Sequence, residues 1–225
     1  SVLIQRRIAL PKEKIQDADV VKNPLRSSFA LLRARPDFAR FQWGFMFGGF
    51  ALMLMAPALS IFYADTLALS YESMTVARYI FMGIGVALSS MLWKRGLQSM
   101  QIHRVTGWVL LGFGLFPITL LAASWNPLCL YGAFFIYGIA QAGSHLLWNL
   151  SGTVFAREDD SSPYTAVNLL MLGLRGVVAP FLGGILCDLW GPLYVLIAGA
   201  LICFAGMVYM LLNKNFEIIS SVKAR

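Results

Sequence analysis

The chain has 225 residues, of which 58% are hydrophobic and only 13% are charged, and its formal net charge is +7. Soluble domains are about a quarter charged, and a soluble domain of this length could not bury six separate apolar runs of about 20 residues each. The composition therefore excludes an ordinary soluble protein and predicts an all-α, polytopic membrane protein. Positive charge in such a protein reports orientation and contact with anionic lipid, so no nucleic-acid partner is expected.

Residues 1–40 form a polar, basic segment that we expect to be a cytoplasmic linker. The segment holds nine of the eighteen Lys and Arg residues and is broken by three prolines. Between Leu25 and Arg35 apolar residues interleave with arginines, a pattern that suits a short interfacial helix. The chain opens on Ser without a signal peptide, so we expect that an upstream portion is missing.

Six apolar runs follow and predict a transmembrane bundle over residues 41–213, with a cytoplasmic tail at 214–225. Each run is long enough to cross about 30 Å of hydrocarbon as a helix. The runs are Phe41–Tyr63, Ser73–Trp93, Val105–Ser124, Leu128–Leu150, Pro163–Cys187 and Leu193–Leu212. Glycines such as those of Gly44-x-x-x-Gly48 and Gly183-Gly184 are interpreted as helix-packing seams, because small residues let helices approach closely in lipid.

The remaining basic residues set the predicted orientation. With residues 1–40 in the cytoplasm, sixteen of the eighteen Lys and Arg residues fall on that side and none in the three opposite loops. This asymmetry predicts that both termini are cytoplasmic. Cys129, Cys187 and Cys203 have neither metal-ligand nor redox spacing, so no metal site and no cofactor are expected.

Two arginines, Arg78 and Arg175, lie inside predicted spans. A charge at the bilayer centre costs about 2.5 to 3.5 kcal/mol and is usually placed in a bundle interior or a wet cavity. Arg175 is expected near mid-bilayer, whereas Arg78 is close enough to one end to snorkel toward Glu72 or Asp65. For both arginines the alternatives are substrate binding and an ion pair that fixes helix packing.

The fourth run carries a polar stripe formed by Gln141, His145 and Asn149. Their spacing of four places the three side chains on one helix face, which should point toward other helices or water instead of lipid. His145 could pass a proton near neutral pH, or it could be hydrogen-bonded to a neighbouring helix. His103 is expected to be solvated in a cytoplasmic loop. Runs three and six carry no ionisable side chain and are expected to face lipid.

Several stretches resemble the C-terminal half of a bacterial major facilitator superfamily transporter. The best are Gly138-Ile-Ala-Gln-Ala-Gly143, Leu147-Trp-Asn-Leu150 and Leu172-Gly-Leu-Arg-Gly-Val-Val-Ala-Pro-Phe-Leu-Gly-Gly184, and Arg35-Pro-Asp-Phe-Ala-Arg-Phe41 is similar to the segment that leads into the seventh helix of that fold. The resemblance implies two inverted three-helix repeats, with runs one and four lining the substrate path. The stretch Trp93 to Arg104 keeps the basic residues of the family's loop but lacks its Asp, which brings the usual gating ion pair into question.

The resulting hypothesis is secondary active transport of a small solute across a bacterial inner membrane, by alternating access, as half of a twelve-helix carrier. Arg78 and Arg175 would join Gln141, His145 and Asn149 in binding the solute, and Arg175 would favour an anion or pair with a carboxylate. The other half would precede Ser1 or arrive as a second subunit.

Two rival hypotheses are a non-transporting receptor or scaffold and an intramembrane enzyme. We expect no enzyme, because Ser144 and His145 diverge by about 100° on a helix and cannot form a nucleophile–base pair.

Overall fold

The structure is a computed structural model that describes residues 24–156 and 160–212. Within these two ranges every regular element is a helix and no strand occurs. The first 23 residues of the predicted linker, Arg157 and the predicted tail lie outside the described residues, as do the basic residues counted in them.

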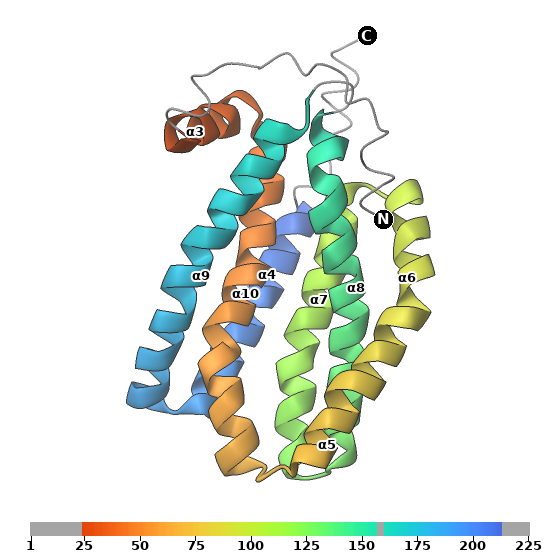
Figure 1. The fold of residues 1–225 in the computed structure, drawn as a ribbon, viewed down its shortest axis with the longest axis vertical. Coiled ribbons are helices and arrows are strands. Elements are labelled where there is room, and N and C mark those ends of the chain that lie inside the picture. Colours follow the sequence, from red (N-terminus) through yellow and green to blue (C-terminus); the bar gives the residue numbers. More distant parts are fainter. Residues whose placement is uncertain (1–23, 157–159, 213–225) are drawn as a thin grey trace, which may run out of the picture.

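Six long helical segments run roughly parallel, and one short helix lies across one end of them (Figure 1). The short helix is α3 (Pro24–Ala34), and we call its end of the bundle the α3 end and the opposite one the α5 end. The first two segments are composite, since each contains a π-helical stretch. In chain order the elements are α4 (Pro36–Ile61), η1 (Phe62–Thr66), α5 (Tyr71–Thr75), η2 (Val76–Phe81), α6 (Met82–Ser99), α7 (Ile102–Leu121), η3 (Ala122–Ser124), α8 (Leu128–Ala156), α9 (Ser162–Trp190) and α10 (Pro192–Leu212).

Five of these segments are long and apolar enough to cross a membrane, so the chain is a multi-pass helical membrane protein. The five are Pro36–Thr66, Tyr71–Ser99, Ile102–Ser124, Ser162–Trp190 and Pro192–Leu212. The sixth predicted span coincides with α8, which has 29 residues but is not among the five. Its polar stripe, formed by Gln141, His145 and Asn149, lowers the mean hydropathy of the helix.

Several helices extend beyond the predicted apolar limits, including α8, which reaches Ala156 instead of Leu150, and the first two segments show the cause. The first begins at Pro36 instead of Phe41, because proline at the first helical position and Asp37 in the first turn both favour a helix start. The second continues past Trp93 to Ser99, carrying Lys94 and Arg95 outward from the apolar part. The length of an apolar run indicates how much of a helix faces lipid. The helix itself can continue beyond that run.

The helices pack in the order α9, α4, α10, α7, α8 and α6, each against the next. This order has an internal symmetry. Exchanging α4 with α8, α6 with α9 and α7 with α10 reverses the order and leaves every neighbour unchanged. The first helix of each predicted triplet therefore packs against the second helix of the other triplet.

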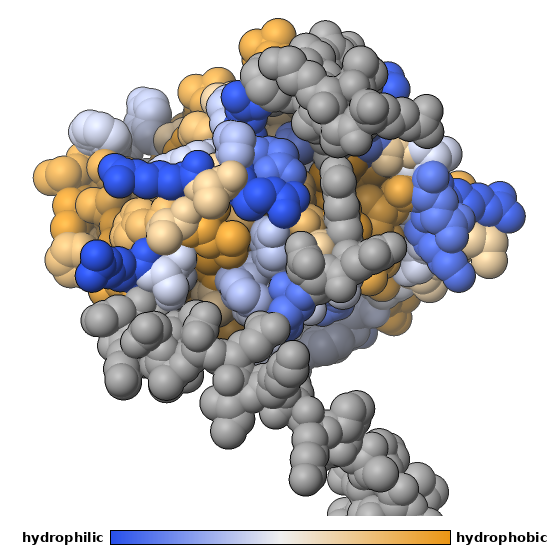
Figure 2. Space-filling model, turned by 90° about the horizontal axis from the view of Figure 1, so that it is seen from above, coloured by the Kyte–Doolittle hydropathy of each residue, from blue (hydrophilic) through white to orange (hydrophobic). Residues whose placement is uncertain are grey.

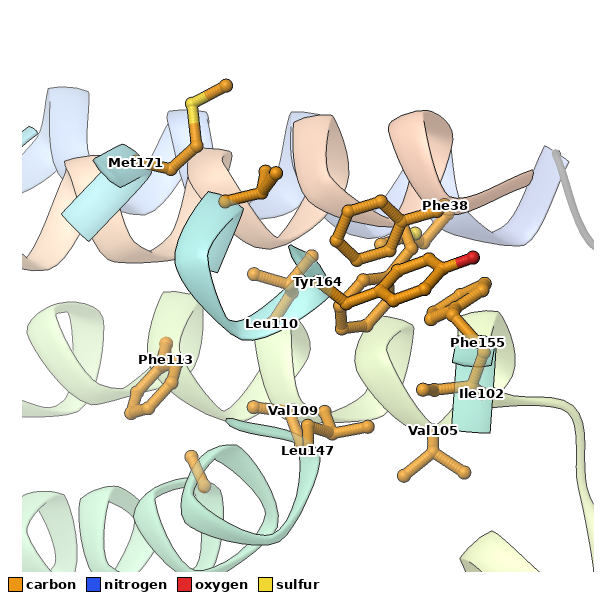
Figure 3. Packing of buried hydrophobic residues seen from close by; sticks show 14 of the residues in the cluster. Phe38, Ile102, Val105, Val109, Leu110, Phe113, Leu147, Phe155, Tyr164 and Met171 are labelled. Atoms are coloured by element: carbon orange, nitrogen blue, oxygen red, sulfur yellow. The ribbon is translucent and has the colours of Figure 1, made fainter. Parts of the chain in front are cut away.

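In the core at the α3 end, aromatic rings from different helices pack together (Figure 3). Phe38 lies edge-on to both Phe155 and Tyr164, with ring centroids 5.2 and 4.9 Å apart. Those three rings come from α4, α8 and α9, so they join helices from both predicted triplets. Around them pack buried aliphatic residues of α7, including Ile102, Val105 and Val109.

Glycines set the closest helix contacts, as the packing interpretation predicted. A Cβ at Gly183 on α9 would collide with the backbone carbonyl of Leu54 on α4, and one at Gly85 on α6 would collide with that of Phe135 on α8. Both contacts lie between the first helix of one triplet and the second helix of the other, which only small residues permit at this distance.

The expectation that run three faces lipid is wrong for α7. The apolar stretch of α7 is 56% buried inside the bundle, against 17% for the second segment. The reason is that α7 packs against both α8 and α10, so α7 and α10 together occupy the middle of the packing order. A lack of ionisable residues suits an enclosed apolar helix as well as a lipid-facing one.

Positive charge gathers at the α3 end. In the described ranges every Lys and Arg except Arg78 and Arg175 lies there, namely Arg26, Arg33, Arg35, Arg40, Lys94, Arg95 and Arg104. Figure 2 views this end and shows hydrophilic side chains spread over it within an apolar rim. Asp65, Glu72 and Asp188 lie toward the α5 end.

Candidate functional site

A cavity of about 320 Å³ lies between α4, α7, α8 and α9, and we call it the central cavity. Its wall is largely apolar, with Phe45 and Leu52 of α4 on one side and Val109 and Phe113 of α7 on another. Its polar groups come from three helices: Thr106 of α7, Tyr137, Gln141, Ser144 and His145 of α8, and Arg175 of α9. A mostly apolar cavity with a few converging polar groups is the common form of a small-molecule site.

Among the described residues, Arg175 is the only charged one that lines the central cavity. It is 8% exposed, and its guanidinium carbon lies 5.6 Å from the centroid of the Phe45 ring. Its buried Nε has no hydrogen-bond partner, and the side chain makes no ion pair with any residue of 24–156 or 160–212. The sequence-predicted ion pair with a carboxylate is therefore not formed within the described part of the chain.

Gly49 makes the room that the Arg175 side chain occupies. A Cβ at Gly49 would fall on the guanidinium group, whose Nη1, Cζ and Nε are its nearest neighbours. The arginine thus lies directly against the backbone of α4. Sequence reasoning missed Gly49, although the adjacent Gly48 belongs to the Gly44-x-x-x-Gly48 pattern; only the fold reveals which glycine faces the arginine.

Gln141 and His145 lie together in the central cavity, as their spacing predicted. The Gln141 amide Nε2 and the His145 ring Nε2 are 2.9 Å apart. An amide nitrogen can only donate, so the ring nitrogen is the acceptor in this bond. The partner of His145 is therefore on its own helix and not on a neighbouring one.

The third residue of the stripe, Asn149, lies elsewhere. It is exposed, and it lines neither the central cavity nor the second cavity described below. Eight residues beyond Gln141 the stripe has left the cavity, because the helix turns 100° per residue and a spacing of four drifts steadily around it. Ser144, one position before His145, lines the cavity in its place.

Contacts on the other side of α8 hold this stripe in position. Trp93 of α6 donates a hydrogen bond of 2.7 Å from its indole Nε1 to the Ile139 carbonyl. The same indole packs where a Cβ of Gly143 would be. On α9, Asn168 donates to the Ser151 hydroxyl across 3.0 Å in a buried position. These bonds fix the rotation of α8 and hence the direction of Gln141 and His145.

A second cavity of about 440 Å³ lies toward the α5 end and contains Arg78. Leu52, Tyr137 and Gln141 line both cavities, so the two adjoin at these residues. Arg78 lies on the π-helical stretch η2, and Tyr63, on the π-helical stretch η1, lines the same cavity. Such π-helical turns are rare and frequently occur at functional sites.

Arg78 does not form the predicted contact with Glu72 or Asp65. The side chain is exposed and makes no ion pair in the part of the chain that the structure describes. Neither cavity is lined by a described Asp or Glu. The structure thus places Arg78 and Arg175 in adjoining hollows, without a described acidic partner for either.

Sequence reasoning also missed a polar cluster around Arg35 at the α3 end. Its guanidinium donates to Asp37 through Nε (3.2 Å) and Nη2 (3.0 Å), to the Tyr164 hydroxyl (2.7 Å) and to the Phe155 carbonyl (3.0 Å). Arg35 therefore ties the start of α4 to the end of α8 and the start of α9. In the sequence, the only signal at Arg35-Pro-Asp is its similarity to a segment that leads into a transmembrane helix.

His103 corrects another expectation. The sequence predicts a solvated loop residue, but His103 lies in the first turn of α7 and is 3% exposed. Its ring is edge-on to Phe41, with centroids 6.5 Å apart. The helix α7 begins at Ile102, three residues before the apolar run, and so draws His103 into the core.

Comparison with known proteins yields no relative: no family model, no curated protein and no solved structure matches the chain.

Proposed function

We propose that this chain is half of a secondary carrier that moves a small anionic solute across a bacterial inner membrane by alternating access. The observation that carries the proposal is the Arg175 guanidinium, which is buried at the central cavity without an anionic partner among the described residues. A cation inside a membrane bundle is costly unless it is paired or serves a site, and a bound anion would supply the missing charge.

The groups around Arg175 suit recognition of such a solute. Gln141 and Ser144 offer neutral hydrogen-bonding groups in the same cavity, while Phe45 and Phe113 offer apolar contact. A guanidinium can bind a carboxylate or phosphate through two parallel hydrogen bonds. The solute would then be oriented by its anionic group at Arg175 and by its polar groups along α8.

In this proposal α8 is a sixth span. Its 29 residues exceed the length that a membrane requires, and it packs between α7 and α6, both of which are apolar enough to cross. Polar residues are tolerated in a span where they line a cavity instead of facing lipid. The basic α3 end would be cytoplasmic by the positive-inside rule, with both termini on that side.

The symmetric packing order supports a pair of inverted three-helix repeats. Each first helix, α4 and α8, lines the central cavity, and each second segment carries one of the two intramembrane arginines. Carriers built from such repeats bind their solute near the midplane, between two moving units. A second six-helix unit, in the same chain or as a subunit, would complete the site on the open side of the cavity.

The rival hypotheses have less support. A non-transporting receptor or scaffold would not require a solute-sized cavity that holds an unpaired cation. A measurement of solute flux through the protein would exclude this hypothesis. An intramembrane hydrolase needs a base beside its nucleophile. Here the hydrogen-bond partner of His145 is the Gln141 amide and not the hydroxyl of a nucleophile.

Substitution of Arg175 tests the proposal. In the carrier completed by its second six-helix unit, we expect Arg175→Leu to leave insertion and expression intact and to abolish flux of the anionic solute. Arg175→Lys should keep part of this flux, since the charge remains without the two-pronged geometry. Gly49→Ala, which displaces the guanidinium and leaves its charge, should weaken flux, whereas Gly173→Ala is the control because a Cβ there meets nothing within 4 Å. Normal flux in Arg175→Leu, or loss of folding in that variant, would assign Arg175 to packing.

A further inference from the structure

The helix α3 has one face on the bundle and one face away from it. Ser28 is 5% exposed, and Leu31 and Leu32 pack against the core of the α3 end. On the other face Leu25 and Phe29 are 58% and 59% exposed, and Arg26 and Arg33 are exposed beside them. An exposed face with both large apolar and basic residues is typical of helices that lie at a lipid interface.

Arg26 and Arg33 lie on the same side of α3. They are seven residues apart, which turns the helix by nearly two full turns and separates them by about 10 Å along its axis. Together with Phe29, Ala30 and Ala34 they line one open hollow. Neither arginine forms an ion pair with a residue of the described ranges. The hollow therefore presents two positive charges beside one aromatic ring and two small side chains.

A second hollow adjoins the first in the groove between α3 and α9. It is lined mainly by apolar groups, with Leu31 on α3 and Pro163 and Ala166 on α9. Ala30 and Ala34 line both hollows, so a single molecule could occupy the two. Three residues after Ala166, on the same side of α9, Leu169 is 57% exposed, and this continues the groove onto the outer apolar surface of α9.

We propose that this corner binds one anionic phospholipid, with its phosphate between Arg26 and Arg33 and an acyl chain in the groove between α3 and α9. The two hollows match the two parts of such a molecule: a basic site for the headgroup and an adjoining apolar site for the chain. Phe29 also lines the basic hollow and would contact the lipid beside its headgroup. A neutral phospholipid lacks the net charge that the arginine pair would compensate.

The proposal is tested by lipid titration of the purified full chain in a neutral detergent. Phosphatidylglycerol should raise the thermal unfolding midpoint and should remain bound in native mass spectrometry, whereas phosphatidylcholine should do neither. The double variant R26Q/R33Q should bind phosphatidylglycerol about thirtyfold more weakly, since each basic residue near an anionic lipid contributes about 1 kcal/mol. Both forms should unfold at the same temperature in phosphatidylcholine, which shows that the variant is folded.

The chain offers a matched control for diffuse charge. K94Q/R95Q also removes two positive charges, from exposed positions on α6 at the same end of the bundle but away from α3 (Figure 1). This variant should bind phosphatidylglycerol with wild-type affinity. Ala166→Phe fills the apolar hollow and should weaken binding of phosphatidylglycerol without changing either arginine. Equal losses in the two double variants, or equal binding of the neutral lipid, would overturn the site. Stabilisation by glycerol 3-phosphate alone, as strong as that by the lipid, would also overturn it in favour of a soluble phosphate.

Discussion

Arg175 carries a charge that the described residues around it do not balance. Burial against Phe45 and Gly49 removes its Nε from water, and this desolvation is compensated neither by an ion pair nor by a hydrogen bond within the described ranges. An uncompensated charge makes the cavity electrostatically attractive to an anion. The central cavity is thus suited to anion binding both by its arginine and by the lack of a described carboxylate beside it.

The polar stripe predicts graded effects along α8. We expect Gln141→Ala and His145→Ala each to weaken solute binding by about 1 to 3 kcal/mol, the range for a lost hydrogen bond that leaves a buried partner unsatisfied. Asn149→Ala should change binding little, because Asn149 is exposed and lines neither cavity. Solute-dependent thermal shift measures the three, with Leu146→Ala as the control. Equal losses at all four positions would indicate a packing defect of α8.

At the scale of single residues, the sequence predicts which polar residues lie in the spans better than it predicts where the fold places them. Arg175 and Gln141 could be found because a polar group in an apolar run is rare and costly. A spacing of four places Asn149 on the same face only approximately, and over eight residues the helix drifts out of the cavity. Gly49 and Tyr137 could not be found, since glycine and tyrosine are common in membrane helices and only the contacts of the fold distinguish these two.

Between helices, the closest contacts depend on single glycines. Gly183 faces the backbone of α4, whereas a Cβ on its neighbour Gly184 would meet nothing within 4 Å. We therefore expect Gly183→Ala to force α9 from α4 and to lower the free energy of unfolding by about 1 to 3 kcal/mol, as overpacking does. Gly184→Ala is the matched control and should be neutral. The unfolding midpoint in detergent measures both, and similar values for the pair would contradict the contact.

The helical segments themselves were largely predictable, because an apolar run of membrane length is rarely anything but a helix in lipid. The start of α8 at Leu128 agrees with the predicted limit, and α10 starts at Pro192, one residue before the predicted Leu193. The π-helical stretches η1 and η2 were not predictable, since they depend on how the backbone adapts around Tyr63 and Arg78 and leave no signature in hydropathy. The enclosed position of α7 was likewise a property of packing and not of its composition.

As a whole, the described part of the bundle gathers its basic residues at the α3 end, and this asymmetry predicts its orientation in the membrane. On a background without the native cysteines, single cysteines at Leu69 and Asn126, near the α5 end, should react with an impermeant thiol reagent added to intact cells. Cysteines at Gln98 and Ser161, near the α3 end, should react only after the membrane is opened. The opposite pattern would reverse the orientation and assign the central cavity to the other side.

We propose that a wet, anion-attracting cavity lies within the membrane-embedded part of this chain. A cysteine in place of Ser144, which lines that cavity, tests it without knowledge of the solute. The thiol should react with an anionic methanethiosulfonate reagent faster than with a cationic one, and Arg175→Gln should remove the difference. A cysteine at Val177, 76% exposed on α9, should remain unreactive in lipid. A Ser144 cysteine that is as unreactive as the one at Val177, or whose reaction ignores the charge of the reagent and of Arg175, would contradict the account.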